Sequence, residues 1–138
     1  MKSGYILLFC LIIILVAGCK EENQQQQLIC TEQYETISVK IKDIQNIPVA
    51  LENFKVTRLV DQTDMTVKVD PAGYTIMQKQ GTYPITSDFF ERQLNKKNVE
   101  VVFTGMKDGK IVVNQQYSIT SDGCHVKLIS GEREIVIK

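Results

Sequence analysis

Apolar and polar side chains alternate along most of the chain from residue 34 onward. Ile37, Val39 and Ile41 point to one side of an extended chain and the polar residues between them to the other, which predicts a half-buried strand. The same pattern predicts further strands at 49–59, 65–69, 82–85, 99–104, 111–119, 125–129 and 134–137. Pro84 confines the 82–85 strand to a sheet edge, because proline cannot donate to a central ladder.

Turn residues separate these segments at short intervals. The turns are predicted at 43–46, 107–110 and 130–131, and Asp70-Pro71 closes the strand at 65–69. Asp108-Gly109 favours a type I′ hairpin turn between the strands at 99–104 and 111–119. One short helix is predicted from Asp88 to about Leu94, with Asp88 and Glu91 as a capping box. Seven or eight strands with almost no helix predict an all-β fold, a single immunoglobulin-like or prealbumin-like β-sandwich.

The first residues carry a different pattern. After Met1-Lys2-Ser3, an uncharged apolar run extends from Tyr5 to Ala17. A membrane-spanning helix needs about 20 apolar residues, so this run suits the apolar core of an export signal better.

The run ends in Leu15-Val16-Ala17-Gly18-Cys19, which resembles the lipobox of bacterial lipoproteins. In that family a diacylglycerol is attached to the cysteine thiol, and cleavage falls just before the cysteine. The resemblance implies a cleaved signal peptide at 1–18 and lipidation of Cys19. The alternative is an uncleaved anchor helix in which Cys10 and Cys19 stay ordinary thiols.

Residues 19–29 are polar until their end, and we interpret them as a lipidated, flexible tether. The residues Lys20, Glu21 and Glu22 resemble the export signal that sends some Bacteroidota lipoproteins to the outer face of the outer membrane. The expected location is therefore the outer membrane, through the lipid, with the sandwich at 30–138 exposed at the cell surface. The alternative is a merely soluble tether and a domain facing the periplasm.

Two further cysteines, Cys30 and Cys124, lie in the predicted sandwich. In a chain sent to an oxidising compartment, one remaining pair predicts a disulfide. That bond would close a loop of about 95 residues, and the chain-entropy model gives such a loop roughly 4–5 kcal/mol. Two free buried thiols are the alternative, and no CxxC spacing indicates a metal site.

The charge balance excludes one class of partner. The chain has 16 basic and 16 acidic side chains, so loss of Lys2 with the signal leaves the mature part nearly neutral. Nucleic-acid binding depends on clustered lysine and arginine, and no nucleic-acid partner is expected.

The segment Ile37-Ser-Val-Lys-Ile-Lys-Asp-Ile-Gln-Asn-Ile-Pro-Val49 resembles the opening strand and turn of transthyretin-like and carboxypeptidase-regulatory-like sandwiches. These sandwiches are common in lipoproteins of the Bacteroidota. Asn46-Ile47 stands where that family usually has a glycine before the proline, which leaves the turn type open. Enzymes of the transthyretin-like group, the 5-hydroxyisourate hydrolases, end in Tyr-Arg-Gly-Ser and use histidines. This chain ends in Glu132–Lys138 and has one histidine, which disfavours that activity.

The residues predict no catalytic site, no metal site and no cofactor. His125 follows Cys124, but neighbours on a strand point to opposite faces, so a Cys–His pair is not expected. We interpret His125 as a surface or edge-strand residue beside the disulfide, Tyr74, Tyr83 and Tyr117 as packing residues, and Phe89-Phe90 as fixing the short helix to the core. The acidic residues, including Asp61, Asp64, Asp70, Glu91 and Glu100, show no metal-loop spacing.

The expected function is a non-catalytic binding or accessory module of the cell envelope, with a protein or glycan ligand. One alternative is an inhibitor of a host hydrolase, since some lysozyme inhibitors are lipoproteins of similar size with a β-fold and one disulfide. Inhibitors present a protruding loop, and the segments Val60–Asp64 and Lys107–Lys110 are the candidates. The other alternative is a small enzyme of unknown class.

Overall fold

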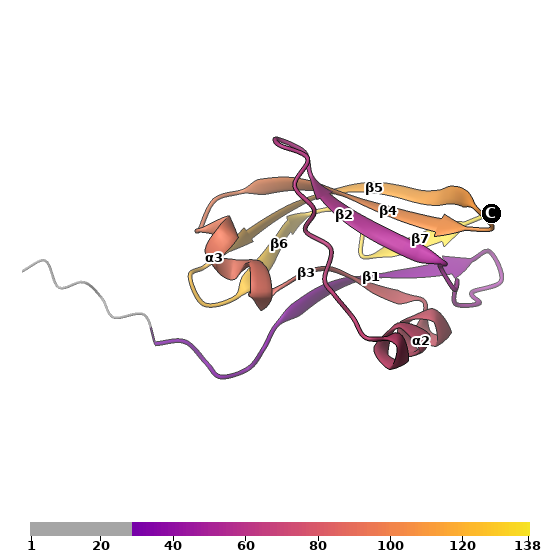
Figure 1. Cartoon of the computed structure of the whole chain (residues 1–138), viewed down its shortest axis with the longest axis horizontal. Coiled ribbons are helices and arrows are strands. Elements are labelled where there is room, and N and C mark those ends of the chain that lie inside the picture. The colour runs from indigo at the N-terminus through magenta and orange to yellow at the C-terminus, as the bar shows by residue number, and fades with distance from the viewer. Residues whose placement is uncertain (1–28) are drawn as a thin grey trace, which may run out of the picture.

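The computed structural model describes residues 29–138, which form two facing β-sheets (Figure 1). The predicted signal peptide, Cys19 and the Lys20-Glu21-Glu22 segment lie outside the described residues. One sheet has the strand order β3-β1-β7 and the other the order β2-β4-β5-β6. The strands are β1 (Thr36–Asp43), β2 (Asn53–Arg58), β3 (Thr82–Ser87), β4 (Val99–Lys107), β5 (Lys110–Ser121), β6 (Val126–Ser130) and β7 (Glu134–Ile137). The predicted all-β sandwich is confirmed.

The alternation along β1 places its apolar residues in the core. Ile37, Val39 and Ile41 are buried, and they belong to the same core cluster as Val101 and Phe103 of β4. The turn after β1 forms as predicted. Asn46 adopts the left-handed conformation, φ 63°, that its small polar side chain tolerates, so it can stand where a glycine is usual.

The hairpin from β4 to β5 is the longest pairing in the molecule and runs from Val99↔Ile119 to Lys107↔Lys110. Asp108 and Gly109 both have positive φ, 52° and 69°, as the type I′ turn requires. Pro84 lies in β3 at the edge of its sheet, which confirms the predicted edge position. β7 forms at its predicted residues and pairs in parallel with β1, so the chain changes sheets after β6.

One predicted strand does not form, and one helix forms that was not predicted. Met65–Val69 is not a strand of either sheet, although the Met65 side chain is fully buried. The segment after it forms helix α2 (Pro71–Gln80), which was not among the predicted elements. Asp70 caps this helix by accepting a hydrogen bond from the Gly73 N–H, and Gly81 ends it with φ 61°. Asp70 before the helix, Pro71 as its first residue and Gly81 after it are the sequence signals of a helix start and stop.

The short helix near residue 90 forms as a 3₁₀ turn, η1 (Asp88–Phe90), followed by α3 (Glu91–Leu94). The predicted capping box is wrong, because the N-cap residue is Ser87 and it makes no side-chain capping bond. The Asp88 carboxylate is bound instead to residues from β6 and from the segment before β1, as described below.

Candidate functional site

The disulfide between Cys30 and Cys124 is present, with a Cα–Cα distance of 5.3 Å. It joins the start of the described chain to the loop between β5 and β6, at the end of the sandwich where the N-terminal segment leaves (Figure 1). Cys124 is therefore not a free thiol, and it cannot serve as a nucleophile beside His125.

A second set of contacts fastens the same end. The His125 Nδ1 atom lies 2.7 Å from Asp88 Oδ2, and its Nε2 atom lies 2.8 Å from the Thr31 hydroxyl. The Asp88 carboxylate also accepts hydrogen bonds from the backbone N–H groups of Glu35, at 2.8 Å, and Val126, at 2.9 Å. Residues from η1, from the start of β6 and from the N-terminal segment are thus held by one carboxylate. We name Thr31, Asp88 and His125 the junction cluster.

Asp122 fixes the loop that carries the disulfide. Its Oδ1 accepts hydrogen bonds from the N–H groups of Cys124, at 2.8 Å, and His125, at 2.9 Å. Its Oδ2 lies 2.9 Å from the Lys127 ammonium. The loop that presents His125 is consequently ordered by its own carboxylate.

The junction cluster favours its ionised form. The hydrogen bond to Asp88 raises the pKa of His125 above its ordinary value of 6.5. Burial alone would raise the pKa of Asp88, but the hydrogen bonds from Glu35, His125 and Val126 outweigh it and lower that pKa below 3.8. At mildly acidic pH the two side chains therefore form an ion pair.

A hydroxyl, an imidazole and a carboxylate in this order also occur in acyl-transfer enzymes, where an oxyanion must be stabilised by free N–H donors. Here four N–H groups near Asp88 and His125 are already used, those of Cys124 and His125 by Asp122 and those of Glu35 and Val126 by Asp88. The arrangement is suited to holding chain segments together. The sequence indicated His125 only as a surface or edge-strand residue and Asp88 only as a helix cap, and nothing in it marked Thr31. No local pattern brings residues so far apart in the chain together.

A cleft of about 730 Å³ lies next to the junction cluster. It is lined by Tyr34, Asp64, Thr66, Val67, Lys68, Ser87, Phe89, Phe90 and Gln93. The Tyr34 hydroxyl donates to Ser87 Oγ at 2.9 Å and accepts from the Phe89 N–H at 3.2 Å, so the Tyr34 ring is held at the cleft. We name this the Tyr34 cleft. Its mixture of aromatic, acidic, basic and amide side chains suits an amphipathic ligand.

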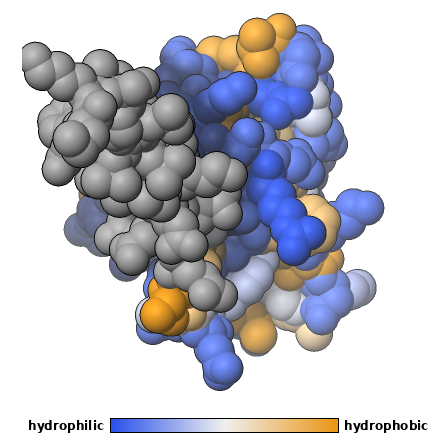
Figure 2. All heavy atoms as spheres, turned by 90° about the vertical axis from the view of Figure 1, so that its left-hand side faces the viewer, coloured by the Kyte–Doolittle hydropathy of each residue, from blue (hydrophilic) through white to orange (hydrophobic). Residues whose placement is uncertain are grey.

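The two neighbouring phenylalanines play different roles. Phe90 is buried and packs in the core, as predicted, whereas Phe89 is 74% exposed and stands over the cleft. Tyr83 and Tyr117 are buried packing residues, and Tyr74 stacks on Phe54 with ring centroids 6.1 Å apart. Figure 2 looks onto this end of the sandwich, where the visible surface is mostly hydrophilic with separate hydrophobic patches.

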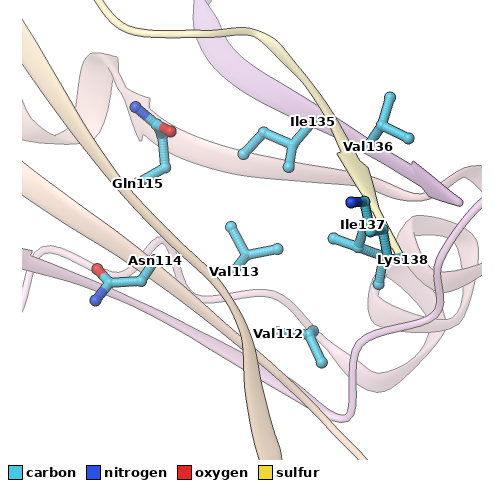
Figure 3. Close-up of a pocket in the computed structure, with 8 residues that line it drawn as sticks. All are labelled: Val112, Val113, Asn114, Gln115, Ile135, Val136, Ile137 and Lys138. Atoms are coloured by element: carbon cyan, nitrogen blue, oxygen red, sulfur yellow. The ribbon is translucent and has the colours of Figure 1, made fainter.

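A second, smaller cavity of about 350 Å³ lies between β5 and β7 (Figure 3). It is lined by Val112, Val113, Asn114 and Gln115 from β5 and by residues 135–138. Val113, Ile135 and Ile137 point into the space between the two strands, while Asn114 points away from it (Figure 3). We name this opening between the sheets the β5–β7 seam.

The predicted inhibitor loop, Val60–Asp64, corresponds in the structure to the segment Leu59–Thr63, because Asp64 pairs with Thr57 in an isolated bridge. This segment projects from the end of β2 (Figure 1). The Arg58 guanidinium binds both carboxylate oxygens of Asp61, at 2.8 and 2.6 Å, and the Thr63 hydroxyl at 3.1 Å. Val60 is 85% exposed. The loop therefore presents an apolar side chain on an internally bonded frame. At the other candidate loop, the N–H groups of Asp108 and Gly109 bind the Glu52 carboxylate, so they are not free to bind a partner.

Within residues 29–138, no group of three or more His, Cys, Asp or Glu side chains is placed to hold a metal ion. In the same part of the chain, no helix is long and apolar enough to cross a membrane. Comparisons of the chain with protein-family models, with curated proteins and with solved structures found no match.

Proposed function

We propose that this protein is a lipid-anchored lipoprotein of the cell envelope, held to the outer membrane through Cys19, whose sandwich is a non-catalytic binding or accessory module. The lipobox-like residues before Cys19 support the anchor. The observation that carries the proposal is the Cys30–Cys124 disulfide, because such bonds persist in oxidising compartments outside the cytosol.

The junction explains how an anchored domain would be held. Cys30 follows Cys19 by eleven positions, and the disulfide and the junction cluster fasten that part of the chain to β6 and η1. A pull on the tether would then load a covalent bond and an ion pair before it reached β1. Two observations support a non-catalytic role: nearby backbone N–H groups are already bonded to the Asp88 and Asp122 carboxylates, and Cys124 is oxidised in the disulfide.

The ligand class is a protein or a glycan, and the Tyr34 cleft is the surface best suited to it. Affinity capture with the lipidated protein from detergent-solubilised envelopes tests this. We expect an envelope component that wild type retains and that Phe89→Asp loses. Ile76→Asp is the matched control, since Ile76 is an exposed residue of α2 that does not line the cleft. Equal capture by all three proteins would contradict binding at the cleft.

A second candidate function rests on the Leu59–Thr63 loop, because a preorganised loop with an exposed apolar residue is typical of hydrolase inhibitors. The purified protein would then inhibit a host hydrolase such as lysozyme, and Val60→Asp would abolish the inhibition. Undiminished lysozyme activity at saturating protein would count against this candidate for that enzyme.

A further inference from the structure

The sheet edges of the sandwich are not equally protected. The outer edge of β2 is covered by the segment after it, since the Met65 N–H donates to the Val56 carbonyl and the Arg58 N–H to the Thr63 carbonyl. At the edge strand β3, Pro84 removes a donor and residues 83–87 are buried. Proline and coverage by other chain segments are the usual means by which proteins prevent edge-to-edge pairing.

The edge of β5 lacks this protection. β6 pairs only with Ser118–Ser121, although β5 begins at Lys110. Among the described residues, no strand pairing or other backbone hydrogen bond covers the β6-side edge of residues 111–116. This edge borders the β5–β7 seam, whose opposite wall is β7 (Figure 3). Alternate N–H and C=O groups of the segment therefore face out of the sheet. The Gln116 carbonyl accepts a hydrogen bond from the Gln115 side-chain amide at 3.1 Å, and residues 29–138 supply no other partner to this edge.

The residue types along this edge favour a second copy of the same strand as the occupant. The segment Ile111-Val-Val-Asn-Gln-Gln116 has no charge, no proline and no glycine. Two such segments side by side would place no like charges opposite one another, and Lys110 would fall outside the paired run. Ile111 is 62% exposed beside the seam and Val136 is 53% exposed at it, so pairing there would also shield apolar side chains.

We propose that this chain forms a two-fold dimer by antiparallel pairing of β5 with β5 of a second copy, with Asn114 on the axis. A two-fold axis normal to the sheet leaves the core-facing side chains of both copies on the core side. Each residue of one β5 must therefore pair with a residue whose side chain lies on the same face. Because side chains alternate along a strand, this requires that one residue on the axis pair with its own copy. Asn114 lies at the centre of Val112–Gln116 and is exposed. Centring there pairs Val112 with Gln116, Val113 with Gln115, and the two Asn114 amides with each other. The proposal does not depend on lipidation of Cys19.

Cysteine cross-linking of the full chain in the cells that produce it tests this geometry. Asn114→Cys is expected to give a disulfide-linked dimer on a non-reducing gel, because its side chain faces its own copy. Lys55→Cys is the matched control, since Lys55 is an exposed residue of β2 in the same sheet, where the strand edge is covered. Equal dimer formation by both variants, or none by Asn114→Cys, would overturn the proposal. A cross-link of Asn114→Cys to a different protein would overturn it in favour of a partner's strand.

A second experiment with paired charges separates loss of the dimer from loss of the fold. Asn114→Lys and Asn114→Asp each place like charges opposite one another at the axis, so each alone is expected to dimerise several-fold more weakly than wild type. An equimolar mixture of the two variants is expected to recover the dimer, measured as protein mass by light scattering of the solubilised full chain. Failure of the mixture to recover a dimer that wild type forms, or a monomeric wild type, would contradict the proposal.

Discussion

His125 Nδ1 lies 2.7 Å from Asp88 Oδ2 and joins the start of β6 to η1 across 37 positions of sequence. Because this contact raises the pKa of His125 above 6.5, its contribution to stability is complete below about pH 6.5 and is lost as pH rises through the raised value. We therefore expect the melting temperature to fall as pH rises above about 6.5. In His125→Asn this part of the fall should be absent.

The acid side of the same pair has the opposite sign. The pKa of Asp88 is lowered below 3.8, so its contribution is present above that pH and is lost as pH falls through the lowered value. The pair should stabilise the fold most between about pH 4 and pH 6.5. Asp88→Asn should lose stability throughout this window. Identical pH profiles for wild type and His125→Asn would contradict an ion pair.

The alternation of apolar and polar residues predicted those strands in which the apolar face is also the face that packs in the core. β7 was predicted at its observed residues because Ser130-Gly131 and alternation define it locally. Met65–Val69 carries the alternation of a strand, yet only an isolated bridge, between Thr57 and Asp64, lies beside it. The segment buries apolar side chains without pairing in either sheet. The alternation of apolar and polar residues alone cannot distinguish such a segment from a strand.

The candidate site was less accessible to sequence reasoning. Cys30 and Cys124 could be paired by elimination, which the structure confirms. Asp88 fitted the spacing of a capping box, but two tertiary N–H donors and an imidazole compete for its carboxylate and displace that role. Thr31, Tyr34 and Phe89 acquire their positions from folding across the sandwich, so no local signal marks them.

Removal of the disulfide should be costly. The bond closes a span of 94 positions, for which chain entropy gives about 4–5 kcal/mol. Cys124→Ser should therefore lower the free energy of unfolding in urea by about that amount, and Cys30→Ser/Cys124→Ser by a similar amount. A thiol assay on native, non-reduced protein should find no reactive group; two reactive thiols would refute the bond.

Tyr83 supports the link between β1 and β2 from inside the core. Its buried hydroxyl donates to the Val49 carbonyl at 2.8 Å and accepts from the Leu51 N–H at 2.7 Å. Tyr83→Phe leaves the Val49 carbonyl and the Leu51 N–H without this partner. We expect the free energy of unfolding to fall by on the order of 1–3 kcal/mol.

Tyr74→Phe is the control for that substitution. The Tyr74 hydroxyl donates to the Leu51 carbonyl at 3.3 Å, and that carbonyl keeps a hydrogen bond from Gln78 at 2.8 Å. Tyr74→Phe should therefore lose clearly less free energy of unfolding than Tyr83→Phe in chemical denaturation. Equal losses for the two variants would contradict the role given to Tyr83.

Surface exposure follows from the proposed export signal. Protease shaving of intact cells should remove the domain from wild type. A variant in which Lys20, Glu21 and Glu22 are all alanine should be protected at unchanged total lipoprotein. Three exposed charges are largely screened beyond about 8–10 Å, and they cannot direct export by long-range electrostatics. They must therefore be recognised directly by a transport machine. Resistance of wild type to the protease would contradict surface display.

The proposed anchor requires that Cys19 carry a lipid. Cells grown with radiolabelled palmitate should incorporate label into the wild-type protein, and Cys19→Ser should incorporate none, because the acylated thiol is gone. Cys10→Ser is the control and should label like wild type, since Cys10 belongs to the proposed signal peptide. Labelling of wild type alongside an unlabelled Cys19→Ser is the predicted result; equal labelling of the two, or none in wild type, would contradict the anchor.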